Sequence, residues 1–377
     1  MAIEWRTLAV KTSVCMALVL TLSSCGSSSS GSPQTPTPTP TPVPTPAPPA
    51  EETQLPLPDT QVVVLSDAMT PTQAIADMGV GINLGNTLDA PTEGEWALAA
   101  EEYYIQAFKD AGFGHVRVPI TWGNHIQAQA PYTIDVDFLD RVEQIVDWVL
   151  DRDLYVIINV HHDSWIKENY DDISQRNRFD SIWIQVSERF KDKSAKLLFE
   201  IINEPRGLEI SEINTLNQRA LSIIRNQFEN RIVVFAGNEW SALDDLFNVA
   251  VPSQTDDFLI ANFHNYDPWN FAGICVQSWG TEQDKEQMET IYQRAAQWSH
   301  DNQIPIMMNE FGVAKYDFQN PENECAQNQR EDYLRTSVSL IHQYGLSATF
   351  WDDGGSFSSY DRANNIWGPE KDILVSQ

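Results

Sequence analysis

Two stretches of the sequence each place an asparagine and a glutamate at the end of an apolar run. "FEIINEPRG" (199–207) carries Asn203 and Glu204, and "IPIMMNEFG" (304–312) carries Asn309 and Glu310. One such glutamate is adequately explained as half of a salt bridge. Two of them suggest a pair of carboxylates that share one reaction, in which one gives a proton while the other attacks or activates water.

The elements that must hold these glutamates alternate between strands and helices from about residue 61 onward. Apolar residues between the strands recur with helical spacing, as at Phe138, Val142, Ile145 and Val149. The repeated strand–helix unit predicts an α/β fold, a (β/α)8 TIM barrel. An open doubly wound sheet is the alternative, but no glycine-rich dinucleotide loop follows the first strand. The predicted strands are 79–85, 115–120, 154–160, 197–203, 231–237, 258–264, 304–310 and 347–352.

In a barrel of this class the active site lies at the carboxyl ends of the strands. A single polar residue there is often a satisfied structural group, but polar residues at almost every strand end are costly to bury without partners or a ligand. The predicted ends carry Asn83, Asn86, Arg117, His161, His162, Asp163, Asn203, Glu204, Asn238, Glu239, Trp240, His264, Tyr266, Glu310, Trp351, Asp352 and Asp353.

Glu204 and Glu310 end strands that lie across the predicted barrel mouth, so their carboxyls would face each other over a cavity. Glycoside hydrolysis uses such a pair. We expect Arg117 and Tyr266 to keep one carboxylate ionised, and partial desolvation to keep the other protonated near neutral pH. Glu200 is disfavoured because it should face differently within its strand.

Four tryptophans in predicted mouth loops or strand ends are candidates for stacking on sugar rings: Trp122, Trp165, Trp269 and Trp351. Core packing is the ordinary alternative for each of them. We expect two or three to contact sugar.

Six blocks in chain order resemble glycoside hydrolase family 5, in the clan of retaining (β/α)8 glycosidases. They are "HVRVPITW", "INVHHDSW", "IINEPRG", "NFHNYDPWNF", "MNEFG" and "FWDDGG", and "GVGINLGNTLDAPTEGEW" is similar to the opening of the endoglucanase members. The resemblance covers roughly residues 65–370. It implies that Glu204 is the general acid/base and Glu310 the nucleophile, an assignment that the residues alone leave open.

The resemblance also implies roles for the neighbours of these two glutamates. Asn203 would hold the sugar 2-hydroxyl, and Trp351 would form the floor under the sugar that is cleaved. The remaining expected substrate-binding or orienting residues are Asn86, Arg117, His161, His162, His264 and Tyr266.

The first sixty residues read as export and tether segments. Arg6 and Lys11 precede a short apolar run, and "LSSC" (22–25) resembles the lipoprotein box of bacteria. We therefore predict a signal peptide over 1–24, a lipidated Cys25, a Ser/Gly and Thr-Pro linker over 25–60 and a catalytic domain over 61–377. The resemblance to such lipoproteins implies, from Gly26 after Cys25, sorting to the outer membrane or cell surface. Ordinary cleavage, with Cys25 incidental, is the alternative.

The net charge of −29 argues against nucleic acid as a partner. Membrane contact is expected only through the lipid, no cofactor is implied, and a monomer is the default. A disulfide between Cys275 and Cys325 is a hypothesis for an exported domain.

Two other functions compete with hydrolysis. Ligands from the "HHD" segment (161–163), His264 and Glu310 would make a metal enzyme, but helical His-Glu-x-x-His spacing is absent and adjacent histidines on a strand point to opposite sides. A non-catalytic glycan-binding protein would lack a glutamate, and both are present. The sequence therefore predicts a retaining endo-β-1,4-glucanase that acts on β-glucan, with xyloglucan, mixed-linkage glucan or mannan as alternative substrates.

Overall fold

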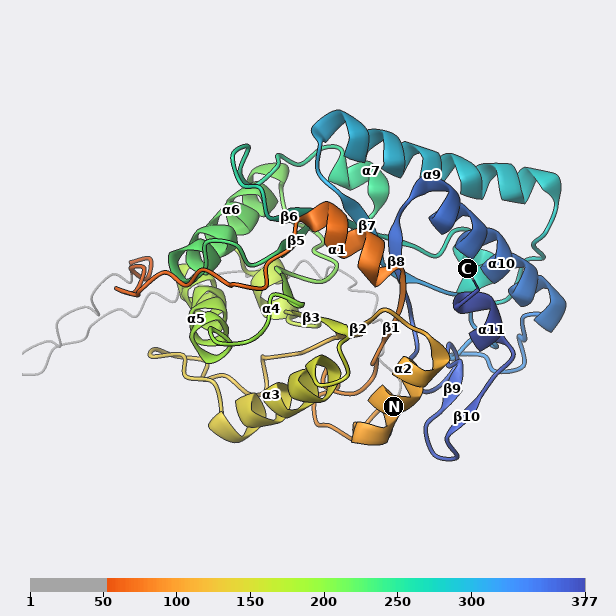
Figure 1. Ribbon diagram of the computed structural model, residues 1–377, viewed down its shortest axis with the longest axis horizontal. Coiled ribbons are helices and arrows are strands. Elements are labelled where there is room, and N and C mark those ends of the chain that lie inside the picture. The colour runs from red at the N-terminus through yellow and green to blue at the C-terminus, as the bar shows by residue number, and fades with distance from the viewer. Residues whose placement is uncertain (1–52, 377) are drawn as a thin grey trace, which may run out of the picture. The chain divides into compact units, whose positions relative to one another are not determined.

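Eight parallel strands close into a barrel in the order in which they occur along the chain (Figure 1). The computed structural model describes residues 53–376. Closure is made by β1 and β8, where Val80 is opposite Ala348. The predicted (β/α)8 barrel is confirmed. The strands are β1 (Val80–Asn83), β2 (His115–Val118), β3 (Tyr155–Asn159), β4 (Leu197–Glu200), β5 (Val233–Ala236), β6 (Leu259–Asn265), β7 (Ile306–Phe311) and β8 (Ser347–Phe350), and β9 (Tyr360–Asp361) and β10 (Ile366–Trp367) form a separate hairpin.

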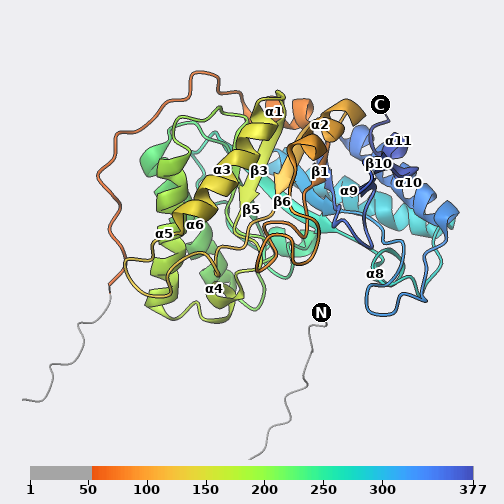
Figure 2. The ribbon, with the colours of Figure 1, turned by 90° about the horizontal axis from the view of Figure 1, so that it is seen from below.

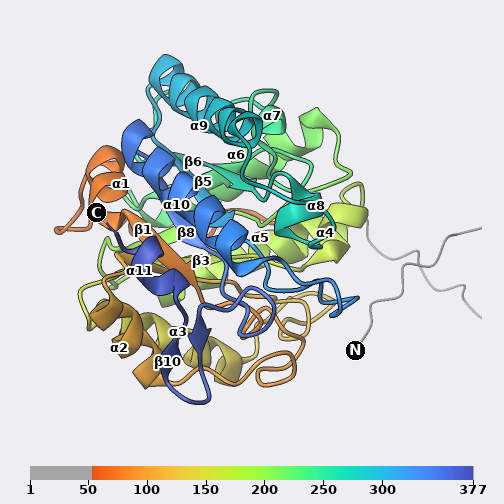
Figure 3. The ribbon, with the colours of Figure 1, turned by 90° about the vertical axis from the view of Figure 1, so that its right-hand side faces the viewer.

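Helices surround the barrel and bury one apolar face each. In α3 the buried face contains Val142, Ile145 and Val149, which confirms the helical spacing read from the sequence. Figure 3 shows α9 and α10 side by side outside the barrel. The helices are α1 (Pro71–Met78), α2 (Glu102–Ala111), α3 (Val136–Leu150), α4 (Ser164–Glu168), α5 (Ile173–Arg189), α6 (Ile210–Gln227), α7 (Leu243–Leu246), α8 (Trp269–Ala272), α9 (Glu282–Asn302), α10 (Gln327–Tyr344) and α11 (Glu370–Leu374).

The barrel interior has an apolar lower layer, which α1 covers. Ile157, Leu198 and Met307 lie in this layer, against Ile75 and Met78 of α1. Figure 2 shows α1 at one end of the barrel and α4 and α8 at the other. Because α4 follows the carboxyl end of β3, the end opposite α1 is the mouth, and apolar packing below leaves it free for polar groups.

One interior position requires glycine. The ring of His115 lies against Gly81, where a Cβ would come within 2.4 Å of three ring atoms. The His115 ring nitrogens contact Thr349 Oγ1 at 2.7 Å and the Met78 carbonyl at 3.1 Å. Burial lowers the pKa of His115 to about 4, so it is neutral at physiological pH.

The segment before α1 forms a strap along α5 and α6 (Figure 2). Asn177, in the first half of α5, exchanges hydrogen bonds with Leu55 N–H and the Thr53 carbonyl, both at 2.9 Å. Asn226, at the end of α6, donates to the Pro58 carbonyl at 2.8 Å. The linker predicted to run to residue 60 is therefore too long: residues 53–60 belong to the folded domain. The rest of the predicted signal, lipid and linker region lies outside the described residues.

A disulfide joins Cys275 to Cys325 with an S–S distance of 2.08 Å. It connects the segment after β6 to the one after β7. Within residues 53–376, no helix is both long enough and apolar enough to cross a membrane.

Candidate active site

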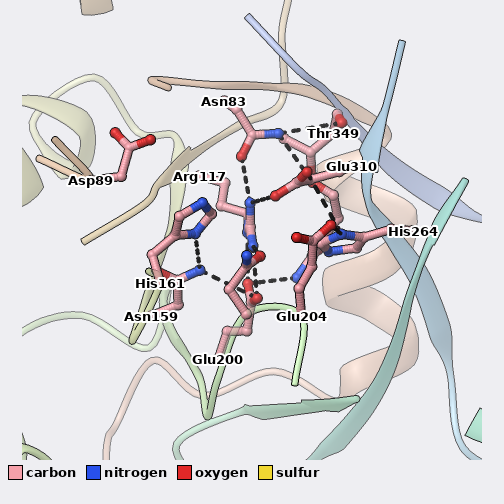
Figure 4. Close-up of polar contacts among 12 residues, drawn as sticks. Asn83, Asp89, Arg117, Asn159, His161, Glu200, Glu204, His264, Glu310 and Thr349 are labelled. Carbon is pink, nitrogen blue, oxygen red and sulfur yellow. Dashed lines mark hydrogen bonds and ion pairs between the residues drawn. The ribbon is translucent and has the colours of Figure 1, made fainter. Parts of the chain in front are cut away.

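Arg117 of β2 occupies the centre of a polar layer just below the barrel mouth (Figure 4). Its Nη1 donates to Glu310 Oε1 and to Asn83 Oδ1, both at 2.8 Å. Its Nη2 donates to Asn203 Oδ1 at 2.6 Å. Its Nε and Nη2 also donate to Glu200 at 2.7 and 2.8 Å. Burial lowers the pKa of Arg117, but the charges of Glu200 and Glu310 raise it by more, so the guanidinium stays charged.

Glu310 lies on β7 and is held by two donors from different strands. Arg117 binds one oxygen, and the Tyr266 hydroxyl donates to Oε2 at 2.9 Å. Burial and the charge of Glu310 raise the pKa of Tyr266, so the hydroxyl keeps its proton for this bond. The predicted contacts of Arg117 and Tyr266 with one carboxylate are therefore present, and that carboxylate is Glu310.

Glu204 lies beyond the end of β4 with φ of 42°, in the left-handed region. This backbone conformation turns its side chain back over the mouth, where it is 27% exposed. One oxygen contacts His264 Nδ1 at 3.1 Å, and Nδ1 is also 3.6 Å from Glu310 Oε2. Glu204, His264 and Glu310 each bring a polar atom to within 4.8 Å of the others. The two predicted glutamates thus face each other, with His264 between them.

The proton balance of this pair differs from the sequence expectation. Burial raises the pKa of Glu310, while His264 and Arg117 lower it, and the net shift is upward. Burial also raises the pKa of Glu204, but the hydrogen bond and charge of His264 and the charge of Lys167 outweigh it, and the net shift is downward. The prediction that partial desolvation would keep a proton on the second carboxyl was therefore wrong for Glu204 in the protein alone.

The direct donors still favour the ionised form of Glu310, because Arg117 and Tyr266 give it two hydrogen bonds that a carboxylate accepts best. Glu204 is the more exposed member, and a sugar chain over the mouth would exclude water from it. Loss of hydration raises the pKa of a carboxyl group. Any molecule that covers the mouth would therefore raise the pKa of Glu204.

His161 and His162 lie beyond β3, which ends at Asn159. Their ring centroids are 4.4 Å apart, so the expectation that they point to opposite sides was wrong: strand alternation does not extend past the strand. His161 is buried and lies parallel to Trp351 at 5.9 Å. His162 is 3.9 Å from Asp89. Asn86, on the same loop as Asp89, donates its backbone N–H to the Asp89 carboxyl at 3.0 Å.

Two groups among the described residues have metal-ligand side chains close together: Asp89, His161 and His162, and Glu204, His264 and Glu310. The donor chemistry fits a metal poorly in both. Asn159 Nδ2 contacts His161 Nδ1 at 3.2 Å, which places the ring proton on Nε2 and occupies Nδ1. In the other group Arg117 and Tyr266 already occupy the oxygens of Glu310.

The four candidate tryptophans separate into surface and core residues. Trp269 is 48% exposed, and Trp351 is partly exposed beside His161. Trp122 is only 1% exposed and donates Nε1–H to the Asn159 carbonyl at 2.9 Å, so core packing, the alternative given for each tryptophan, holds for Trp122. Trp165 donates to Asp163 Oδ1 at 2.9 Å and carries the Arg178 guanidinium 4.3 Å from its ring centroid.

Sequence reasoning missed several members of the site. Glu200 points into the barrel, contrary to the predicted facing, because it bonds Arg117 there. Lys167 of α4 donates to the carbonyls of Asn203 at 2.6 Å and His161 at 3.1 Å, and burial lowers its pKa to about 8. Trp96, 40% exposed, contacts His162 with ring centroids 5.6 Å apart. Side chains two residues apart on a strand face the same side, so Glu200 faces the barrel interior as Leu198 does. This two-residue period in β4 was the signal that would have identified Glu200.

The sequence of the barrel matches a known family. The family described as cellulase (glycosyl hydrolase family 5) matches residues 80–356. The chain belongs to glycosyl hydrolase family 5. The match covers the whole barrel from β1 to the loop that follows β8.

The chain is similar in sequence to named endoglucanases and in structure to a solved Cel5A. Endoglucanase H of Acetivibrio thermocellus is 41% identical over 80% of this chain, which spans only 32% of that protein's length. Endoglucanase B of Ruminococcus albus is 30% identical over 84% of this chain and 82% of its own. The solved structure of Thermotoga maritima Cel5A in complex with cellobiose has a TM-score of 0.76 at 28% identity, covering 81% of this chain and 99% of that one. Another structure of the same protein, at 29% identity and a TM-score of 0.75, covers 81% of this chain and 98% of that one and holds mannotriose.

Proposed function

We propose that this family 5 chain is a retaining endo-β-1,4-glucanase. The single observation that carries the mechanism is the approach of the two carboxyls, whose nearest oxygens lie within 4.8 Å. A retaining glycosidase needs its carboxyls only about 5–5.5 Å apart, whereas an inverting one leaves room for water at about 6.5–9.5 Å. The short separation supports direct attack by one of them.

Glu310 acts as the nucleophile because it holds the two orienting donors. Its oxygen attacks the anomeric carbon, the bond from that carbon to the glycosidic oxygen breaks, and the proton of Glu204 passes to the departing oxygen. Water then gives a proton to Glu204 and attacks the same carbon, which releases Glu310. Arg117 and Tyr266 hold the Glu310 carboxylate in line for both displacements.

The substrate assignment follows from the relatives. Endoglucanases of A. thermocellus and R. albus and a Cel5A that binds cellobiose support β-1,4-glucan. The mannotriose complex of the same Cel5A makes mannan the alternative to test first. Trp269, Trp351 and Trp96 supply exposed aromatic surface near the mouth for sugar rings of either kind.

A substrate panel tests this proposal. Residues 53–377 would be assayed on carboxymethyl cellulose, barley glucan, xyloglucan, mannan and xylan, alongside Glu310→Ala. We expect release of reducing ends from the unbranched β-1,4-glucans, with retention of anomeric configuration in the first product, and loss of both in the variant. Faster cleavage of mannan would change the substrate, and an inverted first product would overturn the mechanism.

We also propose that the protein is exported and lipid-anchored through Cys25, on the strength of the apolar run and the "LSSC" motif alone. Metabolic labelling with a fatty-acid analogue in a bacterial host tests this. Label in the full-length chain that disappears in Cys25→Ser supports the anchor, and equal label in both chains contradicts it.

A further inference from the structure

Glu200 lies inside the barrel on β4 and has no part in the steps given above. Its carboxylate is fully buried, and four N–H groups point at it. Arg117 supplies two, at 2.7 and 2.8 Å, Asn309 Nδ2 one at 2.7 Å and Asn159 Nδ2 one at 3.3 Å. A carboxylate has about four acceptor positions, and these four donors occupy all of them. The contacts thus define Glu200 as a buried anion.

Arg117, in turn, has no donor left to redirect. Its five N–H groups are used twice by Glu200 and once each by Glu310, Asn83 and Asn203. The paired contact with Glu200 fixes the plane of the guanidinium, because rotation would break several of these bonds together. The paired contact with Glu200 therefore fixes the direction of the hydrogen bond that Arg117 donates to Glu310 (Figure 4).

Glu200 also contacts Asn309, the residue that precedes the nucleophile Glu310 in the chain. The pairing of β7 with β8 shifts register between Met308 and Phe311, so on this side Glu310 has no registered partner, and its strand partner is His264 of β6. Asn309 is held by its neighbours: its N–H donates to Asn262 Oδ1 at 3.0 Å and its side chain donates to Glu200 at 2.7 Å.

We propose that Glu200 is a positioning residue that sets the orientation and the basicity of Glu310 through Arg117 and Asn309. The inference rests on the proposed function, since it assumes that Glu310 attacks the sugar. Glu200 shares the charge of Arg117 with Glu310, and without that second anion the whole charge of the guanidinium would act on the nucleophile. The titratable and charged groups that face Glu310 are Arg117, Lys167, Glu200, Glu204, His264 and Tyr266.

Glu200→Gln keeps the size of the side chain and removes its charge. The new amide nitrogen takes the place of Oε1, which accepts from Arg117 Nη2 and Asn159, or of Oε2, which accepts from Arg117 Nε and Asn309. One contact with Arg117 is therefore lost in either orientation. We expect the acid limb of the pH profile to move down by about one unit, because Arg117 then stabilises the Glu310 carboxylate more strongly. We expect attack on the sugar to slow by about tenfold or more, because the nucleophile is less basic and less firmly held. Glu200→Asp keeps the charge and should slow the reaction with a smaller shift of the limb.

The test measures the covalent labelling of Glu310 by a 2-deoxy-2-fluorocellobioside with a dinitrophenolate leaving group, as a function of pH. Dinitrophenolate departs without an acid, so the labelling rate reports the nucleophile and not Glu204. Glu370→Gln is the matched control, because Glu370 is a buried partner of Arg330 in an ion pair between α11 and α10. The control should lose stability and keep the wild-type labelling rate and pH limb.

Wild-type rate and limb in a folded Glu200→Gln variant would overturn the inference. If Glu200→Gln does not fold, Glu200→Asp decides: a slowing of about fivefold or more supports the inference, and a wild-type rate overturns it. A wild-type protein that is not labelled at Glu310 would instead refute the proposed function, and this inference with it.

Discussion

The hydroxyl of Tyr266 gives the sharpest prediction about the nucleophile. Tyr266→Phe removes the 2.9 Å hydrogen bond to Glu310 and leaves the ring in its contacts with Trp269 and Phe357, at centroid distances of 5.9 and 5.7 Å. The variant therefore changes one donor and little of the packing. Of its two direct donors, Arg117 and Tyr266, Glu310 then keeps Arg117 alone.

The magnitude follows from the charge of the acceptor. A hydrogen bond to a charged group contributes about 1.5–3 kcal/mol, and each unit of pKa corresponds to about 1.4 kcal/mol. The side chain of Glu310 is only 7% exposed, so water replaces the lost donor poorly. We expect the pKa of Glu310 to rise by about one unit or more. Because attack requires the carboxylate, activity is lost as pH falls through this pKa, and the acid limb must move to higher pH.

The assay is kcat/KM for an aryl cellobioside from about pH 3 to about pH 9, which reports the pKa values of the free enzyme. Tyr155→Phe is the matched control, since its hydroxyl donates to Asp77 at the same 2.9 Å but at the end of the barrel covered by α1. The control should leave the acid limb in place. An unchanged limb in Tyr266→Phe, or a limb displaced to lower pH, would refute the assignment of Glu310 as the ionised nucleophile.

Four further predictions concern the acid, the disulfide, the interior and the strap. Glu204→Gln should slow glucan hydrolysis by about a hundredfold or more but largely spare attack on a dinitrophenyl cellobioside, which needs no acid; equal losses on both substrates would contradict the acid role. Replacing Cys275 and Cys325 by serine should lower the free energy of unfolding by about 2–4 kcal/mol, measured with urea, and no change would show that the bond adds no stability. The pKa of His115 is depressed to about 4 in the fold, so the stability it contributes is present above its unfolded value and is lost as pH falls from about 6.5 to about 4. The unfolding free energy of the wild type relative to His115→Gln should therefore fall by about 3 kcal/mol over that range in urea titrations, and parallel curves would refute it. A chain that begins at residue 61 should lose about 1–3 kcal/mol relative to one that begins at residue 53, and equal melting temperatures would show that the strap contributes nothing.

The sequence was sufficient for the barrel because the strands are short, β-branched and separated by helical spacing. The strand ends were less certain. The run 197–203 was predicted as one strand, but β4 ends at Glu200, and the following residues turn so that Glu204 reaches the mouth with a positive φ. Ile201 and Ile202 extend the apolar run past the end of the strand because both are buried in the apolar core.

The two glutamates that face each other at the mouth were predictable from their position, whereas the network beneath them was not. Glu200 differs from a surface glutamate only in where its strand places it, and its partners come from three other strands far apart in the sequence. The pKa directions of Glu204 and Glu310 depend on His264 and Lys167, which no local pattern connects to them. Trp122 and Trp269 both follow predicted strands, but Trp122 is buried and Trp269 is exposed. The sequence pattern did not distinguish these two environments.

The strap also determines how a mechanical load would enter the domain. Tension applied at Thr53 meets hydrogen bonds to Asn177 and then to Asn226 before it reaches α1 and the first strand. These bonds lie along the outer helices, so they resist in succession while β1, which carries Asn83, stays unstrained. If the chain were held by its amino terminus while it acted on a moving polymer, the hydrogen bonds of the strap would break first. The strands that carry the site residues would be displaced only after that.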